Sequence, residues 1–110
     1  MESIPKSIAS DLVTVWEGIS EGSVPSLEST IWQRDSLVPG LETSFVILSD
    51  GDTIIIQTRT ENVGRTSSPV TTMYFASRYG WTPIEDIQIE DGDRISLVLG
   101  NITAVELTVN

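Results

Sequence analysis

Residues 43–60 read TSFVILSDGDTIIIQTRT, and this stretch decides the fold class of the chain. Before the turn at residues 49–52, Phe45 and Ile47 share one face of an extended chain; after it, three isoleucines open a second run. A period of two, carried by β-branched residues with stiff side chains, is typical of a pleated strand. Asp50-Gly51 supplies the positive φ that a tight hairpin needs. The stretch therefore predicts two antiparallel strands, over residues 43–48 and 53–60.

The same signals continue on both sides of this hairpin. Downstream, alternation predicts strands at residues 71–77, 84–89, 95–99 and 105–109, with a second Asp-Gly reversal inside 90–93. Upstream, residues 21–42 predict an irregular connection with one short strand at 29–34. The polar residues 61–69 predict a loop, and residues 80–83 predict a turn around Trp81. Six to seven short strands spaced by turn signals about every ten residues predict an all-β sandwich.

Residues 1–20 have a different period. Ile8, Leu12, Val15 and Ile19 recur at spacings of three and four, which predicts an amphipathic helix. Two interpretations stay open: a helix packed on the sandwich of residues 21–110, or the tail of a helix that continues upstream into a membrane anchor. Residues 45–48 form the longest apolar run, so a bilayer-spanning segment is expected only outside this sequence.

Composition excludes several classes of function. The chain has 110 residues, with no Cys and no His, so it lacks thiolate and imidazole chemistry, and we expect no cofactor. Sixteen acidic residues against six basic ones give a net charge of -10, which disfavours binding to nucleic acid and to anionic lipid.

The acidic residues supply weak candidates for chemistry. Gly18–Gly22 matches G-x-S-x-G, but the motif needs a histidine base that the chain lacks. Glu85 and Asp86 are adjacent, so they point to opposite faces of a strand and do not form an acid–base pair. We therefore expect a protein that is not an enzyme, without a metal site. Calcium bound by the acidic turns at 50–52 and 90–93 stays open as an alternative.

Candidate contact residues are aromatic and aliphatic. Tyr79 and Trp81 lie in a predicted turn, where a pair of large rings is hard to bury, so we expect an interface there. Ile54 and Ile56 are expected to offer the isoleucine-rich strand to a partner by edge pairing. Asn101-Ile102-Thr103 is an acceptor triplet for N-glycosylation.

The stretch from residue 53 resembles a family. A β-branched strand running into Glu61-Asn62-Val63-Gly64-Arg65-Thr66, then the strand at 70–76, looks like the strand, Asn-x-Gly, strand pattern of immunoglobulin-like accessory domains. CARDB-type adhesion domains and the soluble domains of the archaellum accessory proteins FlaG and FlaF share it. Residues 89–95 and 102–109 occupy the places of their last turn and hairpin. The resemblance implies an immunoglobulin-like antiparallel β-sandwich located outside the cytoplasm, held near a membrane at the cell envelope.

These observations predict a non-enzymatic structural or protein-interaction domain that binds a protein partner or a second copy of itself. The resemblance implies an accessory part of a motility or surface assembly. The alternative is a small carbohydrate- or ligand-binding module in which Tyr79 and Trp81 stack on a sugar.

Overall fold

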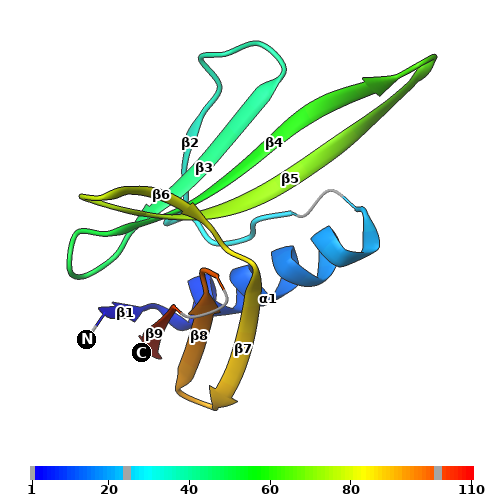
Figure 1. The fold of residues 1–110 in the computed structure, drawn as a ribbon. Coiled ribbons are helices and arrows are strands. Elements are labelled where there is room, and N and C mark those ends of the chain that lie inside the picture. Colours follow the sequence, from blue (N-terminus) through cyan, green and yellow to red (C-terminus); the bar gives the residue numbers. More distant parts are fainter. Residues whose placement is uncertain (1, 24–25, 101–102) are drawn as a thin grey trace.

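A computed structural model of the chain describes residues 2–23, 26–100 and 103–110, which form one helix and nine strands (Figure 1). In chain order these are β1 (Glu2–Ile4), α1 (Lys6–Glu21), β2 (Gln33–Asp35), β3 (Leu41–Ile47), β4 (Thr53–Val63), β5 (Thr66–Ser77), β6 (Gly80–Pro83), β7 (Asp86–Asp91), β8 (Arg94–Val98) and β9 (Ala104–Val109). The prediction of an all-β sandwich with an N-terminal helix is confirmed.

The strands form two sheets. One has five strands in the order β2-β3-β4-β5-β6, so neighbours in the sheet are neighbours in the chain. The other has four strands in the order β1-β9-β8-β7, in which β1 joins β9 as a parallel pair. Helix α1 lies under the five-stranded sheet and beside the four-stranded one, and it touches β5 and β7 (Figure 1).

Helix α1 is an integral part of this packing. Ile8, Leu12 and Val15, spaced by four and three residues, form a stripe that is fully buried. The helix begins at Lys6, directly after Pro5 and the strand β1, so it does not continue toward residue 1. It ends at Glu21 and is capped by Gly22, whose φ of 73° is the left-handed conformation that favours glycine. In the described part of the chain, no helix combines the length and the apolar character needed to cross a membrane.

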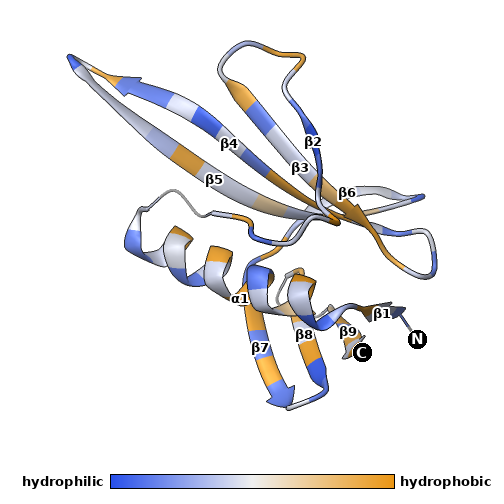
Figure 2. Cartoon of the chain, turned by 180° about the vertical axis from the view of Figure 1, so that it is seen from behind, coloured by the Kyte–Doolittle hydropathy of each residue, from blue (hydrophilic) through white to orange (hydrophobic). Residues whose placement is uncertain are grey.

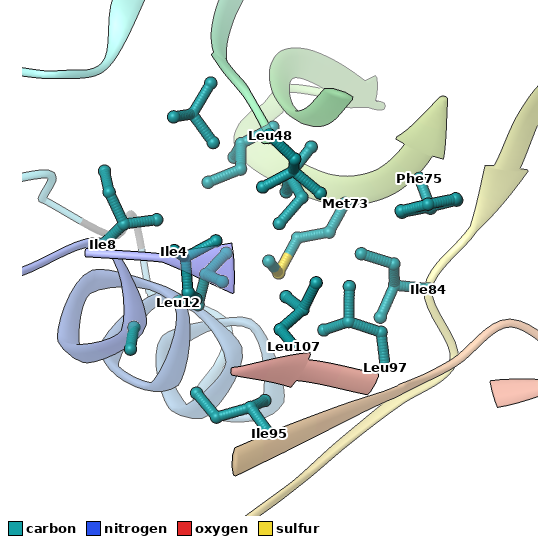
Figure 3. Close-up of a cluster of buried hydrophobic side chains, with 14 of the residues drawn as sticks. Ile4, Ile8, Leu12, Leu48, Met73, Phe75, Ile84, Ile95, Leu97 and Leu107 are labelled. Atoms are coloured by element: carbon teal, nitrogen blue, oxygen red, sulfur yellow. The ribbon is translucent and has the colours of Figure 1, made fainter. Parts of the chain in front are cut away.

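One apolar core joins the helix and the two sheets. Figure 3 shows Ile4 and Leu12 near Met73 of the five-stranded sheet and Leu107 of the four-stranded sheet, with Ile8 at the side of the same cluster. Each fully buried side chain of this size stabilises the fold by about 1.5–3 kcal/mol relative to its exposed form. The core thus holds β1, α1 and both sheets as one unit.

The structure differs from the sequence-based prediction at several places. The short strand predicted at residues 29–34 is β2, which covers only Gln33–Asp35. Residues 61–69 are not a loop, because β4 and β5 stay paired up to Val63↔Thr66 and only the turn at Gly64 interrupts them. Residues 80–83 are not a turn; they form β6, which pairs with the end of β5. Strand β1 was not predicted, since three residues are too few to show a period. Ser and Thr extend the pairing of β4 and β5 beyond the apolar core. The hydropathy pattern therefore gives no signal for a strand there.

The outer halves of β4 and β5, residues 59–63 and 66–70, pair with each other and form a two-stranded arm that projects from the rest of the domain (Figure 1). Figure 2 shows mostly hydrophilic colours along this arm and apolar colours at its base.

Candidate functional site

The outer face of the five-stranded sheet carries an apolar layer of its own. In β4, Ile54 and Ile56 point into the core, and Ile55 between them points to the opposite side of the sheet. Ile55 is only 5% exposed, yet it is not part of the core cluster. The side chains that shield it therefore lie on the outer face.

The strand register identifies these side chains. The pairs Phe45↔Ile55 and Ile55↔Tyr74 place Ile55 between two aromatic rings. The next row across the sheet is formed by Ile47, Thr53, Ala76 and Trp81. Ile47 is 60% exposed and Trp81 is 56% exposed, while Phe45 and Tyr74 are half-buried. The rings of Tyr74 and Trp81 contact each other at 5.7 Å between centroids, tilted by 46°. We call Phe45, Ile47, Ile55, Tyr74 and Trp81 the aromatic sheet face.

The aromatic sheet face is free of charge. The row beyond it, Thr43, Gln57 and Thr72, is neutral on β3, β4 and β5, but it ends in Asp35 on the edge strand β2, which pairs with Thr43. Farther along the same side lies the exposed pair Arg59–Glu61, whose side chains are 3.9 Å apart. In a chain of net charge -10, an apolar surface without carboxylates is a local exception.

The four-stranded sheet presents the opposite outer surface. Its inward residues include Ile95, Leu97 and Leu107, and its outward side carries Arg94 and Glu106. Carboxylates gather along β7, in the β7–β8 turn and on β9: Asp86, Glu90, Asp91, Asp93 and Glu106. This face is apolar inside and polar outside, as expected of a solvated antiparallel sheet.

Trp81 is the predicted contact residue that belongs to the aromatic sheet face. Tyr79 is 84% exposed but lies in the β5–β6 turn, where the Arg78 guanidinium sits 4.8 Å from its ring centre and donates a hydrogen bond to its hydroxyl. The ring beside Trp81 is therefore Tyr74, which the sequence analysis did not select. Asn101, the predicted glycosylation site, lies outside the described residues.

The assignment of Ile54 and Ile56 to an interface needs correction. Their side chains are 0% and 4% exposed, so they present no surface to a partner. Strand β4 is hydrogen-bonded to β3 on one side and β5 on the other, so it has no free edge over its inner half. The triple isoleucine does mark a strand that is apolar on both sides, but the outward residue is Ile55.

Three free sheet edges, those of β6, β2 and β7, are poorly suited to pairing with another chain. The outer edge of β6 is four residues long and ends in Pro83, which has no backbone N–H. At the opposite edge of that sheet, β2 has three residues and carries Arg34 and Asp35. In the other sheet, β7 is acidic and irregular between Ile89 and Asp91. Contact through a face is therefore favoured over contact through an edge.

A polar groove of about 410 Å³ lies on the inner side of the five-stranded sheet. Arg34, Glu42, Ser44 and Thr58 line it; Arg34 donates a hydrogen bond to the Leu27 carbonyl at 3.3 Å. Among the described residues, no group of three or more acidic side chains is placed to hold a metal ion, which leaves the calcium alternative without support.

One buried carboxyl group stands out. Within the described part of the chain, neither buried oxygen of Glu2 has a hydrogen-bond partner. Burial first, and the neighbouring Asp52 and Asp50 second, raise the pKa of Glu2 to about 7. The carboxyl group of Glu2 is therefore mostly protonated below about pH 7 and loses its proton above it. The group lies at the junction of β1 and the β3–β4 turn, where the Ser3 N–H donates to the Ser49 hydroxyl at 3.0 Å.

Comparison with known protein families, with curated proteins and with solved structures finds no match to this chain.

Proposed function

We propose that this chain is a non-enzymatic protein-interaction domain that binds its partner through the aromatic sheet face. The observation that carries the proposal is the placement of Ile55 between Phe45 and Tyr74, on the side of the sheet away from the core. A sheet with apolar residues on both sides is typical of a sheet that is covered on both sides. Exposed apolar patches of this kind mark interaction sites.

The setting we propose is an accessory part of a motility or surface assembly at the cell envelope. This follows from the resemblance of residues 53–109 to the soluble domains of archaellum accessory proteins. A domain in such an assembly works by rigid contact with neighbouring proteins, and a two-layer sandwich with a neutral outer face supports that role.

The test is photocrosslinking in cells that produce the chain. A photoreactive amino acid replaces Ile47 in one variant and Glu106 in another; both positions are exposed on strands, but they lie on opposite outer faces. We expect a covalent protein adduct from position 47 and none from position 106.

Adducts from position 106 alone, or equal adducts from both positions, would contradict the proposal. Circular dichroism of both variants checks that each retains the fold.

A second candidate function is a carbohydrate-binding module. The exposed ring of Trp81, supported by Tyr74, is a flat platform of the kind that stacks on sugar rings. Titration with oligosaccharides, read by tryptophan fluorescence, separates the two functions. A saturable shift that is lost in Trp81→Phe would favour the module, whereas no shift together with crosslinking at position 47 favours protein binding.

A further inference from the structure

We propose that the aromatic sheet face binds the same face of a second copy of this chain, which gives a two-fold symmetric dimer with the five-stranded sheets packed face to face. The inference rests on the proposed function and names the partner. Its support comes from charge, from the arrangement of the exposed side chains and from the size of the face.

Charge favours this surface over the others for contact between copies. Two chains of net charge -10 repel each other, but salt confines the repulsion to carboxylates within about 8 Å of the opposing surface. The rows of Ile47 and Phe45 contain no charged residue from β3 to β6. A partner rich in basic residues would instead be drawn to the carboxylates of β7 and β9. The neutral face therefore fits a partner that is itself acidic.

The exposed side chains are arranged to complement themselves. Ile47 and Trp81 stand at the two ends of one row, with the smaller Thr53 and Ala76 between them. A two-fold axis parallel to the strands, between β4 and β5, brings Ile47 of each copy opposite Trp81 of the other. Two-fold interfaces use one patch on both copies, and this row satisfies that requirement.

The size of the face predicts a weak dimer. Five strands at about 4.8 Å spacing span roughly 20 Å, and three rows of outward residues run about 14–20 Å along the strands. Two such faces together cover roughly 600–800 Å², which is below the standard size of specific interfaces. We therefore expect a weak, transient dimer.

A second apolar surface serves as the internal comparison. Val13 and Trp16 of α1 and Ile87 and Ile89 of β7 line a groove of about 190 Å³. Ile89 is 63% exposed, close to the 60% of Ile47. Glu17 also lines this groove, so two copies joined there would bring like charges together. Ile47 and Ile89 are thus matched in residue type and exposure, but they differ in the charge around them.

The experiment is sedimentation velocity of the purified chain from about 1 to 300 μM in about 0.15 M NaCl, a concentration range wide enough to detect a weak dimer. We expect the wild-type chain to change from monomer to dimer across this range. Ile47→Glu is expected to weaken association at least tenfold, and Ile89→Glu is expected to leave it unchanged. Circular dichroism shows whether both variants keep the fold; if Ile47→Glu does not, Ile47→Ser replaces it.

A wild-type chain that stays monomeric at the highest concentration would overturn the proposed dimer. Equal weakening by the two glutamate variants, or weakening by Ile89→Glu alone, would also overturn it. If the chain stays monomeric but crosslinks to a different protein from position 47, the dimer is wrong and the proposed function still holds. If it stays monomeric and gives no such crosslinks, both proposals are wrong.

Discussion

The two sheets of this domain differ in how much apolar surface their outer faces expose to water. In the four-stranded sheet, Leu97 faces the core and most outward residues, such as Arg94 and Glu106, are polar, so one side is dry and the other is solvated. In the five-stranded sheet, Ile54 faces the core, and Ile55 faces a second apolar layer on the outside. The outer face of the four-stranded sheet is thus mostly polar, whereas the outer face of the five-stranded sheet keeps apolar area exposed to water. The second surface is where a partner gains most from burial.

The largest expected effect compares inward and outward positions in the two sheets. Leu97→Ala and Ile54→Ala each remove a fully buried side chain and are expected to lower the free energy of unfolding by about 3–4 kcal/mol. The outward Val98→Ala is expected to cost less than about 1 kcal/mol, but Ile55→Ala about 2 kcal/mol, because Ile55 is packed between two rings. Urea denaturation at low protein concentration measures all four. If Ile55→Ala lowers the free energy of unfolding no more than Val98→Ala does, Ile55 is not part of a second apolar layer.

The next effect concerns the connection that joins the helix to the five-stranded sheet. Asp11 of α1 is buried and accepts hydrogen bonds from the Ser29 N–H and the Trp32 indole N–H, each at 2.9 Å, and from the Glu28 N–H at 3.3 Å. Asp11→Ala leaves these donors without an acceptor and is expected to cost about 2–3 kcal/mol. Asp35→Ala is the control, since this exposed carboxylate accepts a hydrogen bond from a single described donor, the Leu37 N–H. Similar losses in both variants would contradict the assigned role of Asp11.

The buried carboxyl group of Glu2 is expected to make the free energy of unfolding depend on pH. The pKa of Glu2 is about 7 in the folded chain, against 4.5 as its ordinary value, so the folded chain holds a proton that the unfolded chain releases between these values. The free energy of unfolding therefore falls as pH rises from 4.5 to about 7, by about 2–3 kcal/mol from this group.

Glu2→Gln isolates the contribution of this carboxyl group. The variant is expected to match the wild-type chain at pH 4.5 and to exceed it by about 2 kcal/mol at pH 8. Thermal denaturation in matched buffers measures the difference. A constant difference between wild type and variant across this range would show that Glu2 titrates normally.

The smallest effect belongs to the arm, which has neither of the two kinds of surface. Arg59 and Glu61 are both more than half exposed, so Glu61→Gln is expected to change the free energy of unfolding by less than about 0.5 kcal/mol. Denaturation of the variant alongside the wild-type chain checks this. A loss above about 1 kcal/mol would mean that the arm contributes to the stability of the body.

The sequence was sufficient for the sandwich and insufficient for its outer face. Asp50-Gly51 and the alternation around Ile54 predicted the central hairpin, because turn chemistry and period are local properties. The partners of Trp81 were not local: Tyr74 lies beside it only through the β5–β6 register, and Phe45 only through two further strand pairs. Alternation also does not say which side of a strand faces the core, so Ile54 and Ile56 were assigned to the wrong surface.

The most direct test of the account is hydroxyl-radical footprinting of the chain in its associated state and as a dilute monomer. We expect Trp81, Tyr74 and Phe45 to lose reactivity on association, while Trp16 and Ile89 at the α1–β7 groove keep theirs. Protection of Trp16 and Ile89, with Trp81 and Tyr74 unchanged, would contradict the claim that the outer face of the five-stranded sheet is the contact surface.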